Sequence, residues 1–222
     1  MKQLMEKLKA KGELLLRPNR VDIAVGVGTC GLGNGAGELL QAFIDETALK
    51  KLDIQVRSVG CFGFCANEPL VNIHIPNLPL LILDKVSIED LPWIFSSIEK
   101  KSFPTDRVLC KISTWDHIGT HFTYGVGFDS IPEWNEISYF RSQKKIVLRH
   151  AGLIDPSSIE EYIAVGGYAA FFKAAFEMSS DEVLEEVKNS IRYHKNLQEG
   201  LEEMILSPSK HMNDSNSKLN MS

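Results

Sequence analysis

The strongest constraint on this sequence is the order of strand-like and helix-like segments between residues 21 and 101. VDIAVGV (residues 21–27) has the length and apolar content of a buried strand, and residues 37–52 carry apolar side chains at helical spacing. Three further strand-like runs follow, at residues 53–60, 69–75 and 78–86. Ser87 then caps a second helical pattern with acidic residues in its first turn. The sequence therefore predicts a β-α-β-β-β-α order, which belongs to the α/β class.

This order is that of a thioredoxin-like sheet, so residues 21–101 are predicted to form a thioredoxin-like domain. Proline and glycine interrupt the pattern after this domain, and the last residues are polar and rich in Ser and Asn. The other predicted segments are an N-terminal helix (1–20), a linker (102–142), a mostly helical segment (143–206) and a disordered tail (207–222).

A glycine run, VGVGTCGLGNGAG (residues 25–37), follows the first predicted strand. It contains the spacing G-x-G-x-x-G at Gly26, Gly28 and Gly31, which is the dinucleotide-binding fingerprint. That motif also needs an acidic residue at the end of the second strand, to hold the ribose hydroxyls. Here the second strand ends in VRSVGCFGFC, which has no carboxylate. We therefore favour another use for this loop.

Three cysteines are the candidate functional residues. Cys30 lies in the glycine run, while Cys61 and Cys65 follow the second predicted strand as C-x-x-x-C. Loops that follow two parallel strands emerge at the same end of a sheet, so we expect these cysteines to converge. Thiolates bind metals and iron–sulfur clusters, and glycines let backbone N–H groups approach the sulfurs. A redox pair and ordinary core cysteines are the alternatives, and Cys110 is better explained as a buried apolar cysteine.

Composition and charge exclude several classes of protein. The net charge of −5 means that the chain lacks the excess of basic residues expected of a nucleic-acid-binding protein. The first residues are too charged for a signal peptide, and no apolar run approaches the length of a membrane span. No Ser/His/Asp or paired-carboxylate pattern suggests a catalytic residue. These features predict a soluble, cytoplasmic protein, in which C-x-x-x-C favours metal binding over a structural disulfide.

The two cysteine loops carry a resemblance to a known family. GTCGLGNGA and VGCFGFCANEPLVNI resemble the thioredoxin-like [2Fe–2S] ferredoxin domain of the NADH-binding flavoprotein subunits of NAD(P)-reducing iron hydrogenases and respiratory complex I. In that family the first loop carries C-x-x-x-x-C and the second C-x-x-x-C. The second pattern is present here, but in the first Val25 stands at the earlier cysteine position. The resemblance thus implies a [2Fe–2S] cluster on Cys30, Cys61 and Cys65 with one ligand missing.

The resemblance continues in residues 141–190, which are similar to the segment that leads into the flavin domain of the same subunits. The glycine- and arginine-rich loop that would cradle FMN and NADH does not follow. We therefore expect no FMN or NAD site in this chain and no catalysis by the chain alone. The implied function is electron transfer inside a multisubunit NAD(P)H-linked oxidoreductase or hydrogenase, with its other subunits as partners. A non-redox assembly module with a vestigial cluster site and a truncated flavin subunit are the alternatives.

Overall fold

The computed structural model describes residues 2–117, 120–143 and 145–190 of the chain. It contains two compact units, residues 1–167 and residues 168–222, and each is described by itself. Residues 191–206 of the predicted helical segment and the predicted disordered tail, 207–222, lie outside the described residues. None of the described helices is both long and apolar enough to cross a membrane.

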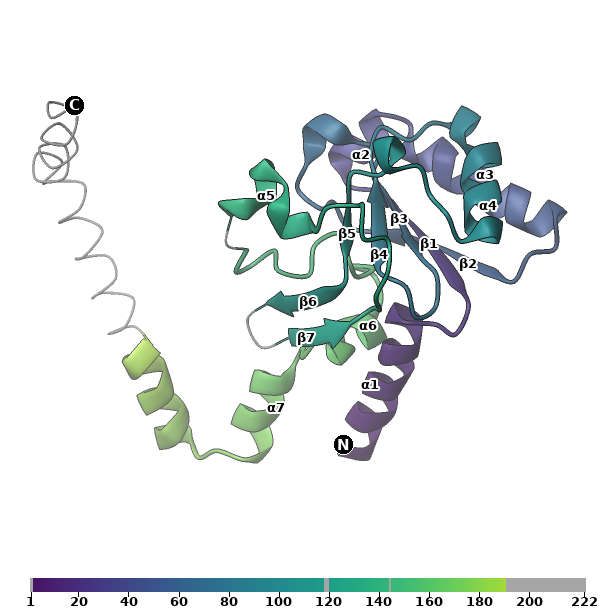
Figure 1. Ribbon diagram of the computed structural model, residues 1–222. Helices are drawn as coiled ribbons and strands as arrows, with labels where there is room; N and C mark the ends of the chain where they lie inside the picture. Colours follow the sequence, from purple (N-terminus) through teal and green to yellow (C-terminus); the bar gives the residue numbers. More distant parts are fainter. Residues whose placement is uncertain (1, 118–119, 144, 191–222) are drawn as a thin grey trace, which may run out of the picture. The chain divides into compact units, whose positions relative to one another are not determined.

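The first unit is built on a five-stranded sheet with the order β2-β1-β3-β4-β5 (Figure 1). Its strands are β1 (Val21–Gly26), β2 (Ile54–Val59), β3 (Val71–His74), β4 (Leu80–Leu83) and β5 (Cys110–Ile112). β1 and β2 are parallel, and every other neighbouring pair is antiparallel. The parallel pair followed by antiparallel β3 and β4 confirms the predicted α/β class with a thioredoxin-like sheet.

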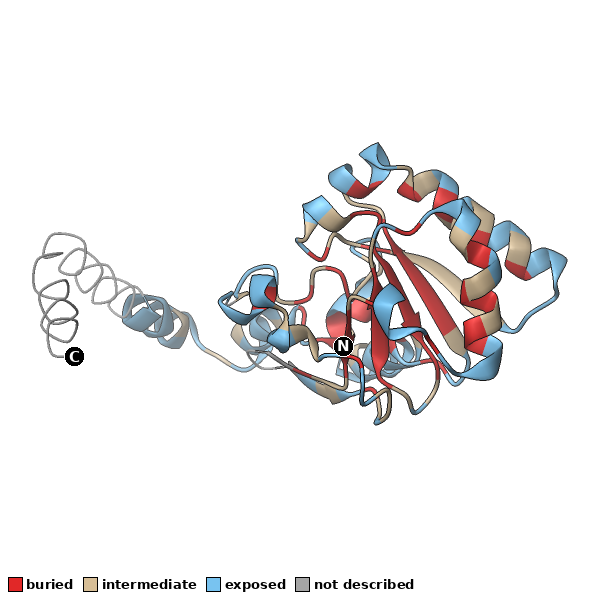
Figure 2. Cartoon of the chain, turned by 45° about the horizontal axis from the view of Figure 1, so that its top comes forward, coloured by how far each residue is buried: buried red, intermediate tan, exposed pale blue. Residues whose placement is uncertain are grey.

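Two helices, α3 (Ala36–Leu49) and α4 (Leu91–Lys100), supply the helical side of the main core. Their apolar faces place Leu39, Phe43 and Ile94 in one buried cluster with Ile23 and Val25 of β1. Figure 2 shows the central strands and the inward faces of these helices as buried. The capping box predicted at Ser87 is present, although the first turn is a short 3-10 helix, η2 (Ile88–Asp90).

A second buried cluster includes side chains of β4 and β5 and of residues beyond the sheet. The segment treated above as a linker, residues 102–142, contains β5 and much of the structure that follows it. It also holds η3 (Thr105–Arg107), the two-stranded sheet of β6 (Thr114–His117) and β7 (Thr120–Thr123), η4 (Trp134–Glu136) and α5 (Ser138–Arg141). Trp115 and Phe140 are fully buried in this cluster. The division of the chain into the five predicted segments stays a prediction.

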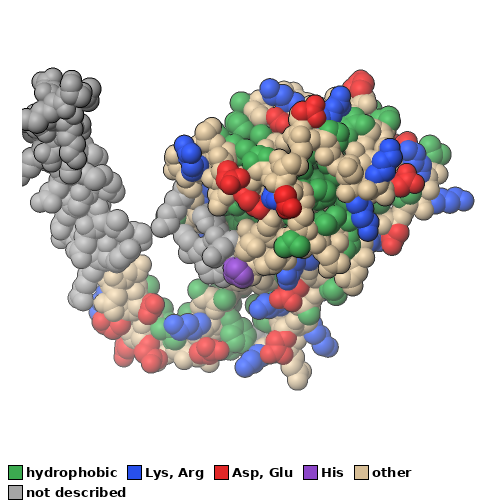
Figure 3. All heavy atoms as spheres, viewed as in Figure 1, with side chains coloured by type: hydrophobic (Ala, Val, Ile, Leu, Met, Phe, Trp, Pro, Cys, Tyr) green, Lys and Arg blue, Asp and Glu red, His purple; other side chains and the backbone are tan. Residues whose placement is uncertain are grey.

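The N-terminal helix, α1 (Lys2–Leu16), packs against α6 (Ile159–Ala164). At Gly12 a Cβ atom would lie 2.0 Å from the carbonyl oxygen of Glu160, so the two helices can approach this closely only at a glycine. The helix ends at Leu16, within the predicted N-terminal segment 1–20. On the face drawn in Figure 3, acidic, basic and apolar side chains are interspersed rather than separated by charge.

The second unit contains α7 (Ala169–Phe176) among its described residues. A further helical run, residues 180–190, begins after Ser179, where Ser179 and Glu182 form reciprocal hydrogen bonds. The Ser179 amide donates to the Glu182 carboxylate at 2.7 Å, and the Glu182 amide donates to the Ser179 hydroxyl at 3.3 Å.

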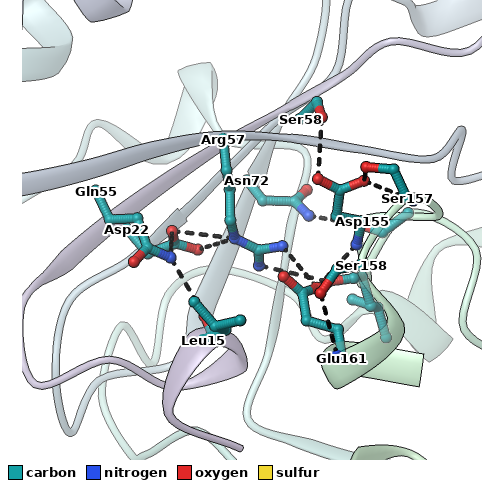
Figure 4. Close-up of polar contacts among 12 residues, drawn as sticks. Leu15, Asp22, Gln55, Arg57, Ser58, Asn72, Asp155, Ser157, Ser158 and Glu161 are labelled. Carbon is teal, nitrogen blue, oxygen red and sulfur yellow. Dashed lines mark hydrogen bonds and ion pairs between the residues drawn. The ribbon is translucent and has the colours of Figure 1, made fainter. Parts of the chain in front are cut away.

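A buried ion network in the first unit joins the sheet to the residues that follow it (Figure 4). Arg57 of β2 donates to both carboxylate oxygens of Asp22 on β1, at 3.1 and 3.0 Å, and to Glu161 at 3.2 Å. Gln55 also donates to Asp22, at 3.0 Å, and to the carbonyl oxygen of Leu15 in α1. Burial raises the pKa of Asp22 although the guanidinium opposes that shift. Arg57 thus compensates two buried carboxylates at once.

Replacing Arg57 by Met should lower the free energy of unfolding by about 3–5 kcal/mol, because both carboxylates would stay buried without their cation. Part of this loss should be recovered at acidic pH, where Asp22 and Glu161 become protonated. Arg107→Met is the matched control, since the Arg107 side chain is half exposed and its ion pair with Asp90 is worth less than about 1 kcal/mol. Chemical denaturation of both variants at several pH values measures the effect. Equal losses in the two variants would contradict the role given to Arg57.

His74, at the end of β3, is 3% exposed, and burial lowers its pKa from 6.5 to about 4. The unfolded chain therefore binds more protons between these pH values, so the free energy of unfolding should fall as pH drops through this range, by at most roughly 3 kcal/mol. Among the described residues neither ring nitrogen has a hydrogen-bond partner. His74→Phe should flatten the pH dependence without loss of stability at neutral pH. His121→Phe, at an exposed position, should keep the wild-type slope.

Candidate metal centre

The two cysteine loops meet at one end of the sheet because β1 and β2 are parallel (Figure 1). The first loop leads into α2 (Thr29–Gly33), which carries Cys30. The second carries Cys61 and ends in η1 (Cys65–Asn67). A Cβ atom at Gly28 would lie 2.7 Å from the Cβ of Cys61, so the close approach of the two loops needs a glycine at that position.

The structure brings the three predicted site cysteines together. The sulfurs of Cys61 and Cys65 are 4.0 Å apart. A hydrogen bond with the thiol of Cys65 raises the pKa of Cys30, so these two thiols are also neighbours. Cys30 and Cys65 are exposed and Cys61 is half-buried, whereas Cys110 is buried within β5. All four are free thiols.

A backbone N–H group of the second cysteine loop points at a sulfur. The amide of Gly63 donates to the sulfur of Cys61 at 3.2 Å. Gly63 has a φ of +95°, a conformation that residues with a Cβ rarely adopt. The glycine between the two cysteines is therefore what allows the loop to curl back on the Cys61 sulfur.

Glu68 is a residue of this site that the sequence analysis missed. Its carboxylate accepts a hydrogen bond from the Cys61 thiol at 3.3 Å and another from the Leu70 amide at 2.8 Å. Burial, followed by the hydrogen bond to Glu68 and its charge, raises the pKa of Cys61. The sequence signal that could have pointed to Glu68 is its position, three residues after Cys65.

Within residues 2–117, 120–143 and 145–190, no three or more His, Cys, Asp or Glu side chains are placed to hold a single metal ion. A [2Fe–2S] cluster shares its four protein ligands between two irons, so its donors do not converge on one point. Three neighbouring thiols beside a buried carboxylate fit the chemistry of such a cluster. Val25, which the resemblance of the loops aligns with a cysteine, is completely buried in the main core.

Residues beyond the sheet hold the second cysteine loop in place. The ammonium group of Lys145 donates to the carbonyl oxygen of Phe62 and lies 4.0 Å from the centre of the Phe62 ring. The hydroxyl of Tyr139 donates to the carbonyl oxygen of Gly63 at 2.6 Å, and its ring stacks on Phe64 at 4.1 Å. The conformation of the loop therefore depends on side chains far along the chain.

No family model matches the sequence. Two solved structures of a thioredoxin-like [2Fe–2S] ferredoxin from Aquifex aeolicus are similar to this chain. The first shares 17% identity, covers 42% of this chain and 93% of the ferredoxin chain, and has a TM-score of 0.37. The second, of the wild-type protein, shares 19% identity, covers 42% and 99%, and has a TM-score of 0.36. Both scores are low, and the fold assignment rests on the strand order of the sheet.

The four thiols should differ in their reactivity towards an alkylating reagent at about pH 8. Cys65 and Cys30 should react first because they are exposed, and Cys61 more slowly because it is half-buried and its pKa is raised. Cys110 should not react in the folded protein, since it is fully buried and burial raises its pKa to about 12. Mass spectrometry of time points measures each rate, with denatured protein as the control. Labelling of Cys110 as fast as Cys65 would contradict the described packing.

Proposed function

We propose that this chain is an iron–sulfur electron-transfer component of a multisubunit NAD(P)H-linked oxidoreductase or hydrogenase. The observation that carries the proposal is the meeting of Cys30, Cys61 and Cys65 at one end of a thioredoxin-like sheet. The resemblance of the two loops to the ferredoxin domain of NADH-binding flavoprotein subunits supports the same conclusion. These cysteines would hold a [2Fe–2S] cluster, which supplies one-electron chemistry when bound.

The exposure of the thiols suits electron exchange with a partner. Cys30 and Cys65 are exposed, so a redox partner can come close to their sulfurs. The Gly63 amide and the nearby ammonium group of Lys145 place positive potential beside Cys61. Both oppose the burial that raises the pKa of Cys61, and both lower the cost of adding an electron nearby.

Exposed apolar side chains beside this site support assembly into a larger complex. Ile146, Val147 and Leu148 are all exposed and directly follow Lys145, which contacts the second cysteine loop. Consecutive exposed apolar residues are typical of protein–protein contacts. We assign this stretch to contact with another subunit of the complex.

A non-redox assembly module with a vestigial cluster site is the second candidate. Two observations favour it. Val25 removes one of the four ligands of the family pattern, and the pKa values of Cys30 and Cys61 are raised, which favours the thiol over the metal-binding thiolate. The two functions differ in whether the folded chain takes up iron and sulfide.

Anaerobic incubation of the purified chain with ferrous iron and sulfide tests the proposal. The wild type should take up iron and acid-labile sulfide in equal amounts, approaching two of each per chain, and develop visible absorption. Cys61→Ser and Cys65→Ser should lose most of this iron, because each removes a thiolate. Cys110→Ser is the matched control and should keep the wild-type content, since Cys110 lies in β5. An iron-free wild type would leave the assembly module as the function.

A further inference from the structure

We infer that Glu68 is the fourth protein ligand of the cluster, so that three thiolates and one carboxylate hold the two irons. This inference rests on the proposed function. In the family pattern a cysteine ligand stands where this chain has Val25. A valine side chain has no atom that can bind a metal. A donor for that position has to come from another residue.

Glu68 lies between the two cysteine loops. One carboxylate oxygen is 3.3 Å from the Cys61 sulfur. The other faces the glycine run, where Cβ atoms at Gly26 and Gly31 would lie 3.4 and 3.3 Å from it. The carboxylate therefore reaches both loops that carry the thiols.

The charge of Glu68 lacks a cation. Glu68 is 6% exposed, and among the described residues no Lys, Arg or His forms an ion pair with it. The other buried carboxylates near the sheet, Asp22 and Glu161, both pair with Arg57. Buried charges in proteins are normally paired or bound to a metal. A metal beside Cys61 would supply the compensation that Glu68 lacks.

The spacing of the donor atoms agrees with tetrahedral coordination. With metal–sulfur bonds of about 2.3 Å and metal–oxygen bonds of about 2.0 Å, two sulfurs on one metal are about 3.8 Å apart and a sulfur and an oxygen about 3.5 Å apart. Each iron of a [2Fe–2S] cluster takes two protein ligands, so Cys61 shares its iron with Glu68, which lies 3.3 Å from its sulfur. The neighbouring thiols of Cys30 and Cys65 are left for the other iron. Carboxylates are established ligands of protein-bound iron.

The competing explanation is that Glu68 only shapes the turn after η1, since it also accepts the amide of Leu70. Glu68→Gln separates the two roles. A glutamine side chain keeps the acceptor for Leu70 but loses the negative charge that binds iron. Glu68→Cys supplies a thiolate in its place. Glu133→Gln is the matched control, because Glu133 also accepts a backbone N–H, that of Ser113, and lies beside β5.

All four proteins are loaded anaerobically with ⁵⁷Fe and sulfide, and iron content and Mössbauer spectra are measured. In the wild type the two irons should be distinguishable, since only one binds an oxygen ligand. Glu68→Gln should hold less than half of the wild-type iron, and Glu133→Gln should match the wild type. Glu68→Cys should hold as much iron as the wild type, and its two irons should become more alike. If Glu68→Gln fails to fold, the wild-type and Glu68→Cys spectra decide the question.

Wild-type iron content and an unchanged spectrum in Glu68→Gln would overturn the assignment of Glu68 while leaving the proposed function intact. The same holds if the two irons are equivalent in the wild type and unchanged in Glu68→Cys. A wild type that takes up no iron would overturn both the ligand and the function.

Discussion

The parallel pairing of β1 and β2 is the constraint on which the rest of the first unit depends. Six residue pairs, from Val21 with Ile54 to Gly26 with Val59, bring both strands to an end at the same level. The next hydrogen bond, from Val27 to Val59, carries the pairing into the loops themselves. On one side of this pair Arg57 and Asp22 lock the strands together. At its end the same pairing places the glycine run against Cys61.

The first unit has two sites with buried carboxylates, Asp22 with Glu161 and Glu68, and their negative charges are compensated differently. Asp22 and Glu161 share a guanidinium that donates to both, and Asp155 and Leu153 add further hydrogen-bonding groups around them. Glu68 is held by a thiol and an amide. Both hydrogen-bond donors to Glu68 are neutral, whereas Asp22 is paired with the positively charged Arg57. The stabilising network has its cation in Arg57, whereas the site proposed at Glu68 would receive its cation from a bound metal.

Most of the sheet could be predicted from the sequence, because each apolar run between residues 21 and 101 matched one strand or helix. The predicted strand at 53–60 corresponds to β2, and Ser87 does cap its helix. The convergence of the cysteine loops followed from topology alone. β5 escaped prediction because three residues are too few to display a period.

Two other features depend on tertiary packing, which no local pattern encodes. Near the start of the segment predicted to be mostly helical, residues 147–153 form turns, and Ile146 to Leu148 are exposed. Glu68 was overlooked because a carboxylate is normally at the surface. Its burial comes from the glycine run and the second cysteine loop closing around it.

The contact between Lys145 and Phe62 has a consequence for the electronic environment of Cys61. The carbonyl that Lys145 binds and the N–H that points at the Cys61 sulfur belong to one peptide group, between Phe62 and Gly63. A cation on the oxygen of a peptide group withdraws electron density through its conjugated bond and makes its N–H a stronger donor. Lys145 thereby acts on the sulfur by induction through a peptide plane, although it lies 83 residues from Phe62 in the chain.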